Sequence, residues 1–535
     1  MPDGQTFSTS TRTVPPAWAD AASLLLILAA AVLLRLTSFV PAVVDTDEGL
    51  YMVQAREWLN GGWPLVAAWD MHPIGAPAMF ALAFLAFGVS VEAVRLLGLL
   101  CVIATGFGLF GAARAAGAPR SVGVGAAVVY AAHSLLLSGL CTNTELLIAP
   151  FVTAAMAIAI RGAARALRAV DPVAPGWPSL VAMGLLVGWA LLVKQVVVPS
   201  GCFAFALLLG PALWRGLLPW RRLLAMAAAY AGLCATPFLL AGFAYWIQGW
   251  LADYLDGSIL APFRYSMERI AAAEAWRRIG TAVLTLGLAF AAALVALVCW
   301  RPRGRLALLT AAAFSWFLIA SLAIAGPGFY FAHYFLLWLP SLSLLAAVGL
   351  WHVARLVARP DPAGSDLARP GVARPGVARP VLAGLLLVLA SQGWLPEMTE
   401  RLERGPGLMH RDPVREVAAA VRQAAGPDGD ALIANYHASV YVIAGVRVAT
   451  RFPFPPHLTG YFEDLSDTNT TVELDRVLAA RPRVIVVDRA WMQTMRPAAA
   501  TQVMAAVAAG YELAATVAER RGPVEIYRVR DQAAP

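Results

Sequence analysis

Apolar segments long enough to cross a bilayer recur along most of this chain, separated by short polar connections. A helix needs about 20 apolar residues to span the hydrocarbon core. The pattern predicts eleven spanning helices, at residues 21–41, 93–112, 121–139, 145–160, 179–194, 199–214, 223–246, 279–300, 306–325, 333–352 and 381–396. One further apolar stretch, Gly75 to Gly88, is too short to cross and is expected at the membrane interface. The first run lacks a following A-x-A cleavage site, which favours a retained signal anchor.

The composition agrees with a membrane protein. Hydrophobic residues make up 59% of the 535 positions and charged residues only 14%. A soluble fold cannot bury so much apolar surface, so the bilayer must act as solvent for most of it. The net charge of +8 comes from arginines clustered between apolar runs, which is typical of membrane orientation and does not indicate nucleic-acid binding.

The distribution of basic residues predicts the orientation. If the Gly75–Gly88 stretch does not cross, 17 basic residues share the side of the N-terminus, and seven lie in the short loops opposite. The positive-inside rule then predicts a multi-pass protein with its N-terminus cytoplasmic and its C-terminus outside.

After the last predicted span the composition becomes that of a soluble α/β domain. Asp412-Pro413 predicts the start of a helix, and the runs ALIANY, RVIVVD and VEIYRV are typical of strands. A tandem G-V-A-R-P repeat marks a low-complexity linker before that span. We therefore expect an α-helical polytopic membrane protein with a cytoplasmic N-terminus (1–20), a transmembrane domain (21–396) with its first periplasmic loop at 42–92, a cytoplasmic linker (353–380) and a periplasmic α/β domain (397–535).

Polar residues gather in the segments predicted to lie outside. The first loop holds Asp45, Asp47, Glu48, Asp70 and His72. Later segments hold Glu145, Lys194, Gln195, Arg264, Tyr330, His333 and Tyr334, and Arg35 lies near the outer end of the first span. Acids, a histidine and cations on one face suit phosphate handling or proton transfer. Lys194 is the single lysine of the chain, and the alternative to a functional ammonium there is a side chain that snorkels to the interface.

Each of these side chains also has a structural interpretation. A carboxylate at the start of a helix can cap it and complement its dipole, which applies to Asp47, Glu48 and Glu145. An ion pair with Arg35 would account for Asp45. Ordinary interfacial or loop positions would account for His72, Arg264 and Tyr330.

Several other chemistries lack their motifs. There is no G-x-x-x-x-G-K-[ST] of an ATP-driven pump, no G-x-S-x-G and no H-E-x-x-H. A nucleotide-sugar donor is not expected, because the acids are predicted to face away from the cytoplasm, where nucleotide sugars are found. Two alternatives remain, namely a lipid-linked sugar flippase or other secondary transporter, and a scaffold or sensor without enzymatic activity. A transporter predicts inverted repeats and midplane polar groups, whereas the charges here lie near one edge.

The motifs of the first loop resemble a known family. A first span ending in Arg-Leu is followed by D-x-D-E-x-x-Y-x-x-x-A-R-E, W-D-x-H-P and an apolar run ending F-G-V-S-x-x-A-x-R-L. Later matches are L-V-K-Q at Lys194 and H-Y-F-L-L-W-L-P from His333 to Pro340. This resembles the bacterial GT-C glycosyltransferases, in the group of the protein O-mannosyltransferases and the lipid A aminoarabinose transferase, which use polyprenyl-monophosphate sugars.

The resemblance implies roles for the first-loop residues. Asp47 aligns with the acid taken as catalytic base, with Glu48 beside it, and Asp70 with the second acid. His72-Pro73 matches the mannosyltransferase branch, whereas the aminoarabinose branch has Lys-Pro. The second proline of that motif is Ile74 here, which leaves the branch and the sugar open.

The function expected is inverting transfer of a sugar from a polyprenyl-phosphate donor, within the membrane lipids, to a periplasmic acceptor that is a lipid, glycan or protein. The leaving phosphate requires cations, for which Lys194, Arg35, His333 and Arg264 are the candidates. The residues expected to contact substrates are His72, Glu145, Gln195, Tyr330 and Tyr334. Asp70 with His72 or Glu48 could hold a divalent metal ion.

Overall fold

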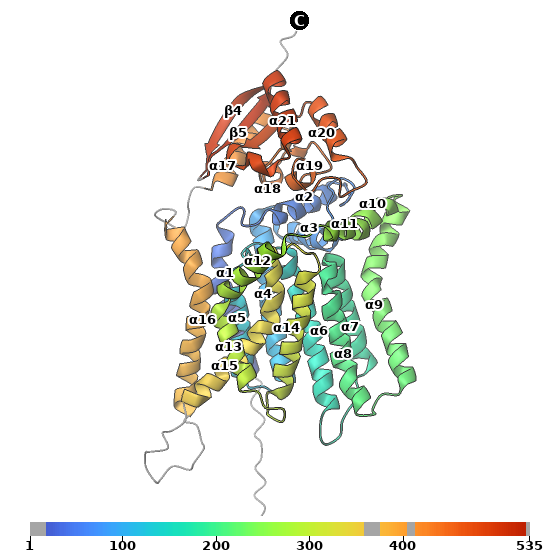
Figure 1. Cartoon of the computed structure of the whole chain (residues 1–535), viewed down its shortest axis with the longest axis vertical. Helices are drawn as coiled ribbons and strands as arrows, with labels where there is room; N and C mark the ends of the chain where they lie inside the picture. Colours follow the sequence, from blue (N-terminus) through green and yellow to red (C-terminus); the bar gives the residue numbers. More distant parts are fainter. Residues whose placement is uncertain (1–17, 358–374, 404–411, 520, 531–535) are drawn as a thin grey trace, which may run out of the picture.

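A computed structural model describes residues 18–357, 375–403, 412–519 and 521–530. It shows a bundle of upright helices with a small mixed-sheet domain at one end (Figure 1). The predicted cytoplasmic N-terminus before Trp18 and residues 358–374 of the predicted linker lie outside the described residues.

Upright helices form the bundle. They are α1 (Trp18–Arg35, continued by η1, Leu36–Phe39), α4 (Val91–Ala115), α5 (Arg120–His133), α6 (Thr144–Ala166), α7 (Trp177–Val193), α8 (Val198–Trp214, preceded by η2, Gln195–Val197), α9 (Trp220–Ile247), α13 (Gly287–Val298), α14 (Ala307–Ala325), α15 (Leu339–Val357, preceded by η4, Ala332–Trp338) and α16 (Pro375–Glu403). Other helices gather at the end of the bundle near the sheet domain in Figure 1: α2 (Asp47–Leu59), α3 (Gly75–Phe87), α10 (Leu251–Leu255), α11 (Ala261–Met267) and α12 (Ala272–Thr285). The short η3 (Asp256–Leu260) joins α10 to α11.

The eleven predicted spans overlap helices, although the span 279–300 falls on two helices bent by 80° and α5 ends at His133, before the predicted end at 139. The chain is a multi-pass membrane protein. Seven helical segments of 19 to 28 residues are long and apolar enough to cross a bilayer, and the α12–α13 pair, bent by 80°, would be an eighth. Helices α3, α7 and residues 380–395 of α16 are apolar but shorter. The expected count of eleven therefore exceeds the seven or eight described segments that meet the length criterion. Helix α3 has 13 residues, as expected for the stretch predicted not to cross.

The C-terminal domain is an α/β unit, as predicted. Its elements are α17 (Pro413–Ala425), β1 (Asp430–Ile433), α18 (Ser439–Ala444), β2 (Arg447–Val448), α19 (Pro455–Leu458), α20 (Thr470–Ala479), β3 (Val484–Asp488), η5 (Arg489–Thr494), α21 (Pro497–Gly510), β4 (Tyr511–Ala518) and β5 (Pro523–Val529). The sheet order is β2-β1-β3-β5-β4, with β1 parallel to β2 and β3, and β5 antiparallel to β3 and β4. The side chain of Asp412 accepts the backbone N–H groups of Val414 and Arg415, which explains why α17 begins there.

Glycines allow close helix crossings in the bundle. A Cβ atom at Gly349 of α15 would lie 1.8 Å from the carbonyl oxygen of Ala292 in α13. A Cβ at Gly393 of α16 would lie 2.0 Å from the carbonyl oxygen of Ala132 in α5. Small residues at such crossings let backbones approach, which is how helices associate where no hydrophobic force acts between them.

This packing yields a stability prediction. Gly349→Ala should destabilise the protein by about 1–3 kcal/mol, because the added methyl group must push α13 and α15 apart. The matched control is Gly384→Ala in α16, where an added Cβ meets nothing within 4 Å. Thermal unfolding of both variants in detergent measures the difference. Equal midpoints for the two variants would contradict the close crossing.

Candidate active site

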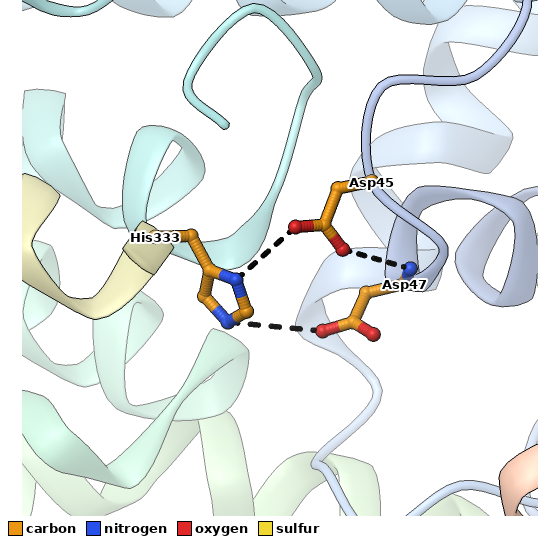
Figure 2. A group of neighbouring side chains, drawn as sticks. All are labelled: Asp45, Asp47 and His333. Atoms are coloured by element: carbon orange, nitrogen blue, oxygen red, sulfur yellow. Dashed lines mark hydrogen bonds and ion pairs between the residues drawn. The ribbon is translucent and has the colours of Figure 1, made fainter. Parts of the chain in front are cut away.

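Two acids of the first loop lie close to a histidine that comes almost 300 residues later in the sequence. Asp45 precedes α2, Asp47 is the first residue of α2, and His333 lies in η4. The Nδ1 atom of His333 lies 3.3 Å from a carboxylate oxygen of Asp45, and its Nε2 atom lies 3.8 Å from one of Asp47. Figure 2 shows the imidazole ring facing both carboxylates.

The start of α2 explains how the two acids are held. Asp45 accepts the backbone N–H of Asp47 at 3.3 Å, so it satisfies a donor that the first turn of α2 leaves open. The helix-capping function that the sequence left open for Asp47 or Glu48 thus falls to Asp45. The side chain of Asp47 remains 31% exposed and is available to a substrate.

The two carboxylates titrate differently. Burial, and next the charge of Asp45, raises the pKa of Asp47 to about 6, although His333, Lys194 and His72 oppose the shift. Burial acts in the same direction on Asp45, but the hydrogen bond and charge of His333 outweigh it and lower the pKa of Asp45. Asp47 is therefore the member of the pair suited to exchange a proton near neutral pH.

Lys194 lies at the break between α7 and η2, where its backbone is extended. Its ammonium is 2.7 Å from Glu145 Oε1 and 3.1 Å from Thr144 Oγ1, both in the first turn of α6. It also lies 4.7 Å from the centre of the Tyr334 ring. The lysine is only 5% exposed, so the carboxylate of Glu145 balances a charge that would otherwise be costly to bury.

Asp70 and His72 form a second pair. His72 Nδ1 lies 2.9 Å from Asp70 Oδ2, and the other oxygen of Asp70 accepts the N–H of Met71 at 2.7 Å. Burial would raise the pKa of Asp70, but the charge and hydrogen bond of His72 prevail and lower it. Ionised Asp70 therefore fixes the His72 ring with its Nδ1–H as donor, which leaves Nε2 for another partner.

A cavity of about 380 Å³ lies beside the two pairs that contain Lys194 and His72, and both of these residues line it. Its polar lining comes mainly from His72, Lys194, Gln195, Tyr265 and Tyr334. The remaining wall is mostly apolar, and it includes residues with strongly exposed side chains, Phe263 at 68% and Leu322 at 63%. A pocket whose lining combines a cation with mostly apolar side chains suits a ligand that joins an anionic group to a hydrocarbon chain.

Three predicted residues lie in other surroundings. Glu48 is buried and accepts hydrogen bonds from Arg95 and from the N–H of Thr142, so it joins α2 to α4 and to the segment before α6. Arg35 is buried and donates to the carbonyl groups of Ser134, Gly139 and Leu140, with no bond to Asp45. Arg264 pairs with Asp256 at 2.5 Å and donates to the carbonyl of Leu465. These contacts favour structural functions, and we therefore leave the three out of the proposed site.

The remaining predicted residues lie at or near the cavity. Gln195 lines it and donates to the carbonyl of Ser258. The hydroxyl of Tyr334 lies 3.5 Å from that of Tyr265, a residue absent from the predicted set. Tyr330 occupies the turn before η4 with a positive φ of 52° and does not line the cavity. Tyr265 could have been found only from the arrangement of α11 beside η4, which the sequence pattern does not reveal.

No protein-family model and no curated protein matches this chain. Solved structures do match it. ArnT from Cupriavidus metallidurans bound to undecaprenyl phosphate has a TM-score of 0.57 at 17% identity, over 96% of this chain and 99% of ArnT. The chain shares the fold of ArnT. The apo state of ArnT gives a TM-score of 0.59, also at 17% identity, over 96% of this chain and 98% of ArnT.

A second neighbour shares this fold. The archaeal oligosaccharyltransferase AglB from Archaeoglobus fulgidus, in complex with an inhibitory peptide and a dolichol-phosphate, has a TM-score of 0.50 at 12% identity, over 97% of this chain and 75% of AglB. Together with ArnT it confirms the GT-C-like fold that the first-loop motifs indicated.

The donor set of Asp45, Asp47 and His333 fits a divalent cation. One ligand atom from each lies within 4.8 Å of the others, and carboxylate and imidazole ligands suit ions such as Mn²⁺. The sequence placed a metal at Asp70 and His72, which stays a prediction. Among the described residues, the group of three possible ligands is the one drawn in Figure 2.

Metal binding can be tested directly. Purified protein should bind Mn²⁺, as followed by electron paramagnetic resonance, and Asp45→Asn should weaken binding because it removes one anionic ligand. Asp70→Asn serves as the control, since Asp70 lies outside the group of three and should leave Mn²⁺ binding unchanged. Unaltered affinity in Asp45→Asn would exclude this group as the ligand set.

Proposed function

We propose that this chain is an integral membrane glycosyltransferase that moves a sugar from a polyprenyl-phosphate donor to an acceptor, with inversion. The observation that supports this most is the cavity, whose lining combines Lys194 and His72 with apolar side chains, of which Phe263 and Leu322 are strongly exposed. The structure of ArnT bound to undecaprenyl phosphate shows that this fold accommodates such a lipid.

The donor phosphate would lie against Lys194 and His72. Both line the cavity, and Lys194 contributes a charge while His72 offers Nε2, because Asp70 engages its Nδ1 atom. Gln195 and the hydroxyls of Tyr265 and Tyr334 add hydrogen-bonding groups. The polyprenyl chain would follow the apolar wall towards Phe263 and Leu322 and so remain in lipid.

Asp47 would serve as the catalytic base. The acceptor hydroxyl attacks the anomeric carbon, its proton passes to the Asp47 carboxylate, and the bond from that carbon to the phosphate oxygen breaks. The polyprenyl phosphate leaves as an anion that Lys194 and His333 stabilise. A divalent cation held by Asp45, Asp47 and His333 would, when bound, supply further positive charge beside the base.

The orientation of the protein supports an acceptor outside the cytoplasm. The sheet domain and the helices that carry Asp47 and His333 lie at the same end of the bundle in Figure 1. The basic loops that the positive-inside rule assigns to the cytoplasm lie between the spans at the other end. We therefore propose an inner-membrane enzyme that acts at the periplasmic face on a lipid, glycan or protein acceptor.

Asp47→Asn should lower turnover of a polyprenyl-phosphate sugar by about 10²- to 10⁴-fold, since a general base typically contributes that much. Binding of undecaprenyl phosphate should persist, because Asp47 does not line the cavity. Unchanged turnover would rule out Asp47 as the base. A transporter that lacks transferase activity would give no transfer in the wild-type protein either.

The pH profile tests the same residue. In protein assayed without added divalent cation, a base with a pKa of about 6 must be deprotonated, so kcat/KM should fall as the pH drops through about 6. Asp45→Asn removes the neighbouring negative charge and should move this acid limb to lower pH. An acid limb that stays in place in Asp45→Asn would show that another group titrates.

Lys194→Met should reduce turnover by roughly 10²- to 10³-fold, because it removes the charge that stabilises the leaving phosphate. The substitution also leaves Glu145 without its cation, which could disturb the fold. The double variant Lys194→Met/Glu145→Gln relieves that unpaired charge and should still be inactive. Recovery of activity in the double variant would assign Lys194 a purely structural function.

A further inference from the structure

The C-terminal domain presents one particular edge of its sheet to the membrane domain. The segments that follow the parallel strands β1, β2 and β3 all start at the same edge, where ligands usually bind in open α/β sheets. After β2, the carbonyl of Arg451 accepts the backbone N–H of Trp69 at 2.6 Å. Helix α18, which follows β1, packs against α2. The edge therefore contacts the loop that carries the candidate acids.

Arg451 joins three separate segments. Its carbonyl group holds Trp69, the residue before Asp70. Its guanidinium nitrogen Nη2 donates to the carbonyl of Leu65 at 2.8 Å and to Asp253 at 3.0 Å. Leu65 belongs to the same loop segment as Asp70, whereas Asp253 lies in α10. One side chain thus links the end of β2, the segment before Asp70 and the helix that precedes η3.

The segment around Asp70 depends on such contacts because it has little regular structure. Between α2 and α3, residues Pro64 and Ala68 form an isolated bridge, and Leu65 has a positive φ of 67°. The ring of Trp69 is 1% exposed and packs against Phe452 at 5.5 Å and His457 at 5.1 Å between ring centres.

His457 contributes packing to this contact. Burial lowers the pKa of His457 to about 4, so its ring is neutral near pH 7. Neither ring nitrogen has a hydrogen-bond partner among the described residues. The C-terminal domain thus supplies the main-chain acceptor, the guanidinium and an aromatic wall that keep Trp69 in place, and Asp70 follows directly.

Asp253, the other side-chain partner of Arg451, lies in the helix that precedes one wall of the cavity. Asp253 in α10 is followed by η3 and α11, which supply Ser258, Pro262 and Tyr265 to the cavity lining. The two sides are already in close contact, since a Cβ atom at Gly257 would lie 2.9 Å from the carbonyl oxygen of Asp70. The distance between His72 and the cavity wall formed by η3 and α11 therefore depends on how the Asp70 segment and α10 are each anchored.

We propose that Arg451 of the C-terminal domain is a positioning residue, which fixes the Asp70–His72 pair against the cavity wall so that His72 can bind the donor phosphate. This rests on the proposed function of the cavity. Arg451 acts through His72 and does not line the cavity itself.

The alternative is that Arg451 is only one of several ties between the domains. A second interdomain ion pair allows this to be tested. Arg415 in α17 lies 2.6 Å from Glu92 in α4, and neither residue lines the cavity. Arg415→Ala removes an ion pair between the same two domains without touching the segment before Asp70, so it is the matched control.

The first measurement is hydrogen exchange of the full-length protein in detergent. Arg451→Ala should speed exchange in residues 63–73, because the carbonyl of Leu65 and the α10 helix lose their common anchor. Arg415→Ala should leave exchange there unchanged. This readout does not require enzymatic activity, so it tests the anchor even if the proposed function fails. Unchanged exchange in Arg451→Ala would overturn the proposal.

The second measurement is a double-mutant cycle on turnover of an undecaprenyl-phosphate sugar. Arg451→Ala should lower kcat/KM for the donor by roughly 10- to 100-fold, as expected when a binding group is displaced by about 1 Å. In the His72→Gln background the same substitution should cost less than about threefold, because its effect passes through His72. Equal losses in both backgrounds, or an equal loss in Arg415→Ala, would overturn the proposal.

Two further variants keep the result interpretable. Arg451→Lys retains the positive charge, but an ammonium lacks the planar guanidinium that donates to both the Leu65 carbonyl and Asp253. This variant should give a loss of kcat/KM between those of the wild type and Arg451→Ala. If Arg451→Ala does not fold, Asp253→Asn removes the partner charge with little change in shape and should lower kcat/KM in the same direction. A wild-type protein without turnover or undecaprenyl phosphate binding would refute the proposed function. An active wild type whose kcat/KM is unchanged in both Asp253→Asn and Arg451→Lys would refute only the positioning residue.

Discussion

The length of helix α3 is the constraint on which the arrangement depends. Thirteen helical residues extend about 20 Å, which is too short to cross a hydrocarbon core of about 30 Å. The chain therefore stays at one end of the bundle from Asp45 to the start of α4, and the first loop remains beside the sheet domain (Figure 1). Because of this, acids of the first loop meet Lys194 and His333, which are more than a hundred residues away in sequence.

Pairing of buried charges then determines which groups remain available. Glu48 with Arg95, and Arg35 with backbone carbonyls, are enclosed and hold segments of the chain together. Asp47 differs from them because its neighbours are another carboxylate and a histidine, and its side chain is partly exposed. The burial that makes the first pairs structural also makes Asp47 the acid whose pKa approaches neutrality.

The sequence pattern predicted those features that depend on local periodicity or on a distinctive residue type. The helical spans, the short α3, the start of α17 and the strands β1, β3 and β5 are of this kind. Lys194 was distinguished as the single lysine, and Glu145 proved to be its partner. The pattern could not separate Asp47 from Glu48, since both begin the same helix and only the packing of Arg95 distinguishes them. The contacts of Arg451, Tyr265 and His457 were not foreseen, because they arise from the docking of segments whose relative placement no sequence period encodes.

The scarcity of lysine has a consequence for observing this protein. Apart from the terminal α-amine, the whole chain carries a single primary amine, and that amine belongs to a residue of the cavity lining and lies against Glu145 and the Tyr334 ring. Reagents selective for amines thus have one internal target, and the rate at which it reacts reports on the accessibility of this cavity alone. The same position offers a built-in attachment point for a spectroscopic label, with no engineered residue required.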